Sequence, residues 1–398
     1  MADPRPDRPD RIDIQTAVEG GHLPALLAAL RCLTGDPTLT AAALRPQVTG
    51  LASADHGLTP DQRAEAVRLA TDRLVAWFAQ GCPPGAAADE ATLRELLEFC
   101  AGNDSEDPPA GPGDRYMPLL RQELGLDGSD LRAPGWTADE LAPGREFRVA
   151  IIGAGFSGLA MAHRCRQAGI EFVVLEKNPD VGGTWAENTY PGCRVDVPSH
   201  LYTFTFAPRD DWPHVYSTQP DIHTYLRDTA INLGITPRIR FRTEITQARW
   251  DEQASTWTLE LATPNGPESL TAHALVSAVG QLNRPNIPDI PGADTFRGPA
   301  FHSARWDHRV DLNGVRVAVI GTGASAAQLV PEIARNAGHV SVFQRTPAWF
   351  IPGPDYRHTT PDAQHWLCAQ VPGYSRWYRF LLFRWYVDGL MPSAQVDR

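Results

Sequence analysis

Several features are scarce in this sequence, and each scarcity excludes a class of function. The six cysteines form no C-x-x-C pair, so neither a redox dithiol nor a clustered metal site is expected. The net charge of −11 disfavours nucleic acid and anionic lipid as partners. No run approaches the roughly 18 apolar residues of a membrane span, and the first residues, MADPRPD, lack the apolar core of a signal peptide. We therefore expect a cytoplasmic protein with reduced thiols and no membrane contact.

The 398 residues allow two or three domains, and the first 146 are predicted to be mainly helical. Leu23–Leu30 is an apolar run typical of a helix. Thr59-Pro60-Asp61-Gln62 predicts a capping box, and apolar residues then recur at helical spacing from Ala64 to Phe78. Two shorter helices and a loop are also predicted, at Thr92–Cys100, Tyr116–Leu124 and Gly102–Gly113. Because the region carries no recognisable chemistry, we expect it to pack or to form a homodimer contact.

From Phe147 the pattern changes to strand, glycine turn, helix and strand, which indicates a parallel α/β sheet. A second unit with the same order runs from Val315 to Gln344. Weaker strands are predicted at Ile239–Phe241, Trp257–Leu261 and Ala274–Val279. The predicted fold class is therefore α/β, with two Rossmann-like dinucleotide-binding domains, residues 147–285 and 286–398, after a helical domain of residues 1–146.

The first glycine turn is Gly153-x-Gly155-x-x-Gly158, directly after an apolar strand. Its glycines allow a tight turn, a close backbone approach to a pyrophosphate and close packing of helix on strand, while the helix N-terminus attracts phosphate. Glu176 ends the second strand, where a carboxylate can accept hydrogen bonds from ribose hydroxyls. The Gly182-Gly183-Thr184-Trp185 segment that follows brings backbone and a flat aromatic wall near a flavin, so we interpret this site as one for FAD rather than NAD.

The second glycine turn is Gly321-Thr322-Gly323-Ala324-Ser325-Ala326, with alanine in place of the third glycine. Its second strand ends in Arg345-Thr346, where an NAD site would carry an acidic residue. Because an arginine can pair with the 2′-phosphate of NADP, this site is predicted to bind NADPH. A surface arginine with no ligand is the alternative.

Between the two turns lies a motif of the form F-x-G-x-x-x-H-x-x-x-W-D, made by Phe296, Gly298, His302, Trp306 and Asp307. It resembles the fingerprint of Baeyer–Villiger monooxygenases, which also place it between two glycine motifs. The resemblance implies that His302 couples domain movement to flavin reduction. Residues 188–226, with YPGCRVD, and the tract from Phe343 to the end are most similar to the 4-hydroxyacetophenone monooxygenases of that family.

The resemblance implies a reaction and a set of site residues. NADPH would reduce FAD, O2 would then give a C4a-peroxyflavin, and attack on a ketone, such as an aryl ketone, would give an ester. Asp196 is the candidate catalytic residue, because the family aspartate partners an arginine that stabilises the peroxide anion. The residues implied to line FAD are Thr184, Trp185, Asp196, Tyr202 and Ile245; those near the nicotinamide are Arg194, Val195 and Asp196; those holding the rest of NADP are Thr322, Gly323, Ala324, Ser325, Gln328, Arg345 and Thr346.

Two family features lack a counterpart in this sequence. The arginine that would face Asp196 belongs to a downstream Lys-Arg motif, and the returning segment that completes the FAD domain ends in an A-T-G-like strand. We therefore expect a chain truncated at its C-terminus. The alternatives left open are an N- or S-oxygenating flavin monooxygenase, which the Trp306-Asp307 ending disfavours, and an inactive dinucleotide-binding or assembly module.

Overall fold

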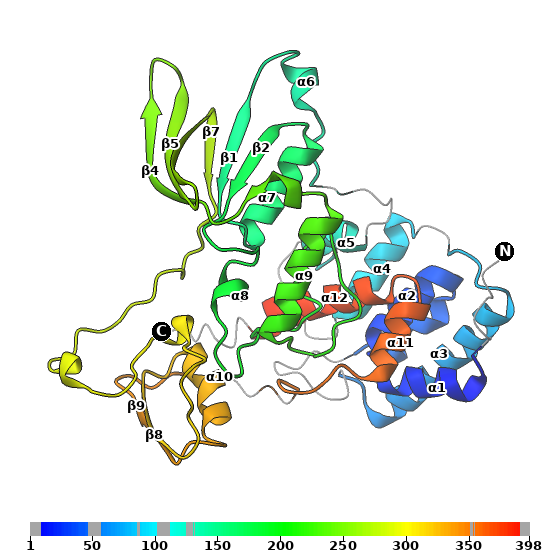
Figure 1. Ribbon diagram of the computed structural model, residues 1–398. Helices are drawn as coiled ribbons and strands as arrows, with labels where there is room; N and C mark the ends of the chain where they lie inside the picture. Colours follow the sequence, from blue (N-terminus) through cyan, green and yellow to red (C-terminus); the bar gives the residue numbers. More distant parts are fainter. Residues whose placement is uncertain are drawn as a thin grey trace, which may run out of the picture. The chain divides into compact units, whose positions relative to one another are not determined.

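The computed structural model describes residues 9–46, 57–85, 88–101, 112–124, 130, 132–350, 353 and 355–390 (Figure 1). The chain forms two compact units. The helical unit comprises Met1–Leu131, Val197–Val215 and Arg357–Arg398, and the sheet unit comprises Arg132–Asp196 and Tyr216–Tyr356. No helix in the described ranges is both long and apolar enough to cross a bilayer.

The helical unit is built from helices at both ends of the sequence. The predicted helices are confirmed, and α3 begins with the predicted capping box, in which Thr59 and Gln62 each cap the backbone of the other. The part of the predicted loop from Gly102 to Gly111 lies outside the described residues, whereas Pro112 and Gly113 begin α5. The elements of the helical unit are α1 (Arg11–Gly20), α2 (Leu23–Thr34), the 3-10 turns η1 (Pro37–Thr40) and η2 (Ala42–Leu44), α3 (Pro60–Ala79), α4 (Glu90–Ala101), α5 (Pro112–Leu124), α11 (Asp362–Gln370), α12 (Tyr374–Arg384) and the π-helical η6 (Trp385–Leu390).

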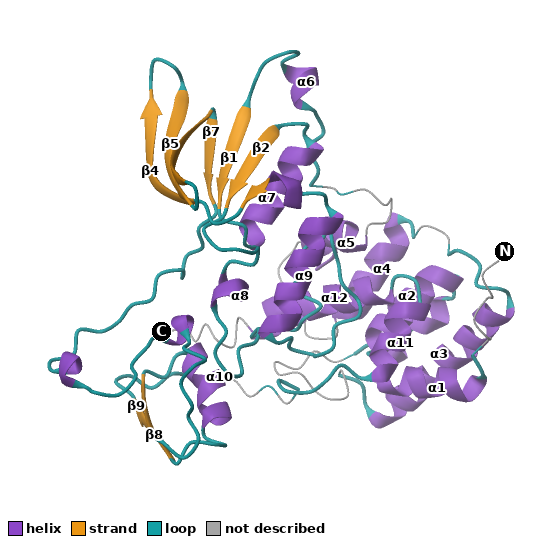
Figure 2. Cartoon of the chain, in the orientation of Figure 1, coloured by secondary structure: helices purple, strands orange, loops and turns teal. Residues whose placement is uncertain are grey.

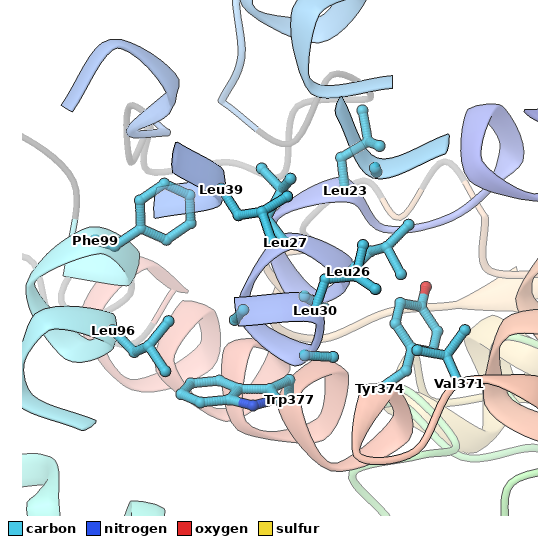
Figure 3. Packing of buried hydrophobic residues seen from close by; sticks show 14 of the residues in the cluster. Leu23, Leu26, Leu27, Leu30, Leu39, Leu96, Phe99, Val371, Tyr374 and Trp377 are labelled. Atoms are coloured by element: carbon cyan, nitrogen blue, oxygen red, sulfur yellow. The ribbon is translucent and has the colours of Figure 1, made fainter. Parts of the chain in front are cut away.

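The core of this unit surrounds α2, which is buried on almost every side from Leu23 to Leu30. Figure 3 shows Tyr374, Trp377 and Val371, all from the C-terminal part of the chain, packed around the α2 leucines. The Tyr374 hydroxyl also accepts a hydrogen bond from the His22 N–H at 2.9 Å. The sequence placed residues 366–383 in the second nucleotide-binding domain, 286–398, but in the structure their apolar side chains complete the N-terminal helical core, because packing there removes them from water.

The sheet unit holds all nine strands of the described residues, drawn in orange in Figure 2. A parallel sheet has the order β3-β2-β1-β7, an antiparallel sheet the order β4-β5-β6, and β8 and β9 form a parallel pair. The strands are β1 (Arg148–Ile152), β2 (Glu171–Leu175), β3 (Ile239–Arg240), β4 (Glu244–Asp251), β5 (Thr256–Thr263), β6 (Gly266–Ala272), β7 (Ala274–Ser277), β8 (Arg316–Ile320) and β9 (His339–Phe343). The helices are α6 (Ala138–Leu141), α7 (Phe156–Gln167), α8 (Thr184–Glu187), α9 (Gln219–Asn232) and α10 (Ala324–Ile333), with 3-10 turns η3 (Thr236–Arg238), η4 (Ala293–Thr295) and η5 (Ser303–Arg305).

The α/β class and the two strand–turn–helix–strand units are confirmed, as are the weaker strands now seen as β3, β5 and β7. Strands β4 and β6 were not predicted. Both are largely exposed along their length, so they lack the alternation of apolar and polar residues that marks a half-buried strand. Leu259 and Leu261 of β5 pack with Ala150 and Leu175, which joins the antiparallel sheet to the parallel one.

Candidate functional site

The first glycine turn joins β1 to α7 at the centre of the parallel sheet. Gly153 has φ +97°, and the helix starts after Gly155, which has no side chain to cap the first N–H groups. A Cβ at Gly158 would lie 1.8 Å from the Gly153 carbonyl oxygen. Only glycine fits there, and the helix N-terminus is thereby held directly against the turn, as phosphate binding requires.

Glu176 follows β2 and is 3% exposed. Its Oε2 accepts a hydrogen bond from the Ala154 N–H at 2.7 Å, and its Oε1 accepts one from the Asn178 N–H at 2.8 Å. The carboxylate therefore holds the backbone of the glycine turn in place at Ala154. Each oxygen can accept more than one hydrogen bond, so the predicted contact with a ribose stays a prediction.

The Gly182-Gly183 segment lies against the first glycine turn. The Gly182 N–H donates to the Ala154 carbonyl at 3.0 Å, and a Cβ on Gly183 would lie 3.2 Å from the Gly155 Cα. Trp185, in α8, is buried, whereas Thr184 at the start of that helix is exposed. Two predicted flavin-site segments, far apart in the sequence, are thus brought together by backbone contacts.

The loop that carries Arg194, Val195 and Asp196 is joined to α10 through Gln328. The Gln328 side chain is buried and its Nε2 lies 2.7 Å from Asp196 Oδ1 and 3.0 Å from the Arg194 carbonyl oxygen. A Cβ at Gly192 would lie 2.7 Å from the Gln328 carbonyl oxygen, so glycine is also required in this loop. The structure therefore brings the predicted catalytic aspartate next to a residue of the second dinucleotide fold.

Two tyrosines that sequence reasoning missed complete this polar cluster. Tyr190 donates to Gln328 Oε1 at 2.8 Å, and Tyr356 donates to Asp196 Oδ1 at 2.6 Å. Burial raises the pKa of both tyrosines well above the ordinary value, and the hydrogen bond with Asp196 raises that of Tyr356 further. Both hydroxyls therefore stay protonated and act as donors at neutral pH. Tyr190 stands in the YPGCRVD motif and Tyr356 in the similar tract that begins at Phe343, but neither was singled out as a site residue.

The fingerprint segment contacts the loop around α8 through residues that the motif does not include. Arg305 donates to Glu187 Oε2 at 3.0 Å, and His308 Nε2 lies 2.8 Å from Thr189 Oγ1. Burial opposes ionisation of Glu187, yet hydrogen bonds from Asn178 and Lys177 and the charge of Arg305 lower its pKa. Glu187 is therefore an ionised anchor for the segment.

The fingerprint residues themselves have local roles. His302 Nδ1 caps η5 by accepting from the Ala304 N–H at 3.1 Å. The Trp306 ring packs edge-on against Phe301 at 5.1 Å between centroids, and hydrogen bonds from Arg309 lower the pKa of Asp307 to about 2. Phe296 is 64% exposed, with Gly298 directly beside its ring. These contacts shape the segment, and the implied coupling role of His302 stays a prediction.

The second glycine turn repeats the first in backbone conformation but is more open. Gly321 has φ +104°, and a Cβ at Gly321 or Gly323 would meet no atom within 4 Å. Thr322 Oγ1 accepts from Gln344 Nε2 at 3.2 Å, so the turn is linked to the end of β9. Arg345 and Thr346 follow there and are exposed, where a ligand phosphate could reach them; Ala324 and Ser325 begin α10.

Two further predicted flavin-lining residues belong to other elements of the chain. Ile245 is in β4 and packs beside Leu261 and the small core under the sheets. Tyr202 belongs to the helical unit, where its N–H donates to the Ser199 carbonyl at 3.0 Å. Their places beside FAD stay predictions.

A profile of the family described as "FMO-like: Flavin-binding monooxygenase-like" matches residues 146–354, more than half of the chain. The chain belongs to this flavin-binding monooxygenase-like family. The matched range runs from β1 to just beyond β9 and so includes both glycine turns and the fingerprint segment.

Other proteins of the family are similar over longer or shorter stretches. A Baeyer–Villiger monooxygenase of Streptomyces coelicolor is 49% identical over 237 residues, covering 59% of this chain and 44% of its own. An uncharacterised monooxygenase of Sinorhizobium fredii is 35% identical over 386 residues, covering 96% and 56%. The crystal structure of OTEMO in complex with FAD and NADP is 35% identical with a TM-score of 0.52, covering 57% and 43%. The chain thus spans about half the length of these proteins.

Proposed function

We propose that this chain binds FAD and NADPH and serves a Baeyer–Villiger monooxygenase reaction, in which O2 and a ketone give an ester. The observation that carries the proposal is the pair of glycine turns in one sheet unit, at Gly153 and Gly321, with the fingerprint segment between them. The similarity to a Baeyer–Villiger monooxygenase and to a structure that contains both dinucleotides supports it.

The first turn fits an FAD pyrophosphate. Gly158 leaves no room for any side chain, the N-terminus of α7 is uncapped by a side chain, and the Gly182-Gly183 backbone lies opposite. The residues that would hold FAD are Gly153, Gly155, Gly158, Glu176, Gly183, Thr184 and Trp185. When bound, FAD supplies the redox chemistry that activates O2, and the protein supplies orientation and charge.

The second turn fits a nucleotide with an extra phosphate. The open turn at Gly321 and Gly323 leaves the N-terminus of α10 accessible, and Arg345 is exposed at the end of β9. A guanidinium there can form a bidentate pair with a phosphate, whereas Asp or Glu would repel it. Thr322, Gln328 and Thr346 would hold the remainder of NADPH.

Asp196 is the proposed catalytic residue. Its carboxylate is exposed, yet two donors, the Tyr356 hydroxyl and the Gln328 amide, fix its Oδ1. A fixed negative charge can orient a neighbouring cation such as the Arg194 guanidinium toward a substrate or a nicotinamide. In this proposal the protein's part is to hold the Asp196 carboxylate and the Arg194 guanidinium in one fixed arrangement.

The decisive experiment is an FAD and NADPH titration of the purified chain. Bound flavin should give the yellow absorption of a flavoprotein, and anaerobic NADPH should bleach it. A chain that stays colourless with excess FAD would overturn the proposal. With flavin bound, the ratio of ester formed from an aryl ketone to oxide formed from an amine or thioether distinguishes the ketone reaction from the N- or S-oxygenating alternative.

The preference for aryl ketones rests only on the resemblance of residues 188–226 and 343–398 to 4-hydroxyacetophenone monooxygenases. A homodimer contact through the N-terminal region is proposed because residues 1–146 carry no recognisable chemistry. The first is tested by comparing aryl with cyclic ketones, and the second by sedimentation of the intact chain.

A further inference from the structure

Tyr356 contacts both charged residues of the 190–196 loop. Besides the hydrogen bond from its hydroxyl to Asp196, its carbonyl oxygen accepts a hydrogen bond from Arg194 Nη1 at 2.7 Å. The Arg194 guanidinium also lies over the tyrosine ring, 5.4 Å from its centroid. One residue therefore contacts Arg194 through its backbone and its ring, and Asp196 through its hydroxyl.

The position of Tyr356 in the chain makes these contacts important. The sheet unit consists of two segments, and three of their four ends are Asp196, Tyr216 and Tyr356. The Tyr216 ring packs against the Tyr356 ring at 5.2 Å between centroids. Residues that lie far apart in the sequence, at 194–196, 216 and 356, thus meet at one tyrosine.

Gln328 cannot hold the aspartate alone. Its amide carries two N–H groups, but three acceptors lie within reach: Asp196 Oδ1 at 2.7 Å, the Tyr356 hydroxyl at 2.8 Å and the Arg194 carbonyl at 3.0 Å. Whichever two acceptors the Gln328 amide bonds, the Tyr356 hydroxyl still donates to Asp196 Oδ1. The tyrosine therefore holds the Asp196 carboxylate in place even when the amide does not.

We propose that Tyr356 is a positioning residue, whose hydroxyl and carbonyl hold Asp196 and Arg194 in one arrangement against α10 and thereby set the rate of flavin reduction by NADPH. The part that concerns flavin reduction rests on the proposed function. The part that concerns the position of the loop does not, because it follows from contacts within the sheet unit.

The variant Tyr356→Phe keeps the ring, and with it the contacts to Arg194 and Tyr216, but removes the hydroxyl. The matched control is Tyr216→Phe, which removes a hydroxyl from the neighbouring ring. The first measurement is hydrogen exchange in the cofactor-free chain, followed in peptides that cover residues 190–196. Because the hydroxyl donates to a charged group, and such hydrogen bonds are stronger than neutral ones, Tyr356→Phe should speed exchange about tenfold, and the control by less than about twofold. Equal exchange in wild type and Tyr356→Phe would overturn the positioning role.

The second measurement is anaerobic reduction of the FAD-loaded chain by NADPH. Tyr356→Phe should lower the limiting rate about tenfold, with the half-saturating NADPH concentration and the amount of bound FAD unchanged. A general loss of structure would lower FAD binding as well. If wild type is reduced and Tyr356→Phe is reduced equally fast, the effect on flavin reduction is wrong and the proposed function stands. If wild type is not reduced, the proposed function and this effect both fail, and hydrogen exchange still decides the positioning role.

Discussion

The closest packing in the first glycine turn makes Gly158→Ala a sharp test of the fold around the proposed flavin site. The new Cβ would lie 1.8 Å from the Gly153 carbonyl oxygen, whereas ordinary contact begins at 3.4 Å, so the two must separate by about 1.6 Å. The neighbours cannot yield easily, because the oxygen belongs to the backbone of the turn and Gly158 lies in the first turn of α7. Overpacking of this kind typically costs about 1–3 kcal/mol or more.

We therefore expect Gly158→Ala to unfold at a urea concentration lower by about 1 M, with a slope of roughly 1–3 kcal/mol per molar, and to bind FAD at least about tenfold more weakly. The matched control is Gly135→Ala, where a Cβ meets nothing within 4 Å and φ is not positive. The control should match wild type in both assays. A Gly158→Ala chain with the stability and FAD affinity of wild type would refute the reasoning that the helix must touch the turn.

Three further substitutions test other parts of the molecule. Trp377→Ala should lower the free energy of unfolding in urea by about 3–5 kcal/mol, because Trp377 is 1% exposed in the helical core. The control Trp349→Ala, at a position that is 99% exposed, should change it very little. Equal urea midpoints for the two variants would contradict the shared core. Burial lowers the pKa of His200 from 6.5 to about 4. As the pH falls between these values, the unfolded chain takes up a proton before the folded chain does, so the free energy of unfolding drops by up to about 3 kcal/mol. His200→Gln should remove this loss in an acid unfolding series, and an unchanged pH dependence would show that His200 is not its source. Arg345→Glu should raise the half-saturating NADPH concentration about tenfold or more and the half-saturating NADH concentration far less. The control Arg335→Glu, at a surface ion pair with Glu332, should leave both concentrations unchanged. An equal effect of Arg345→Glu on the two nucleotides would argue against a 2′-phosphate contact.

Local patterns were sufficient for the elements that carry the proposed chemistry. The capping box at Thr59 and the two glycine turns are signals written in four to eight neighbouring residues, and each produced the expected structure. These local patterns are sufficient because capping, turn conformation and helix initiation depend on residues only a few positions away in the chain.

Features that depend on distant partners were not predictable. Helix α12 packs against α2 and helix α11 packs against α1, but nothing in the sequence of either helix identifies its partner. Strands β4 and β6 are held by pairing with β5 rather than by their own burial. Tyr356 is a single tyrosine in a loop, and its importance appears only when Asp196, 160 residues earlier, lies 2.6 Å away.

The two glycine turns share a backbone conformation but differ in what surrounds them, and the difference agrees with two kinds of ligand. Around the first, Gly158 contacts Gly153, Gly183 lies across from Gly155, and Glu176 braces the turn from the buried side. Around the second, neither Gly321 nor Gly323 has a neighbour within 4 Å of a Cβ position. A coenzyme that stays bound through many turnovers gains from a rigid, preformed site, because little order is lost on binding. A reductant that must leave after each turnover needs an open binding site. If this reasoning holds, FAD should protect the β1–α7 turn from hydrogen exchange far more strongly than NADP+ protects the β8–α10 turn, and equal protection would contradict it.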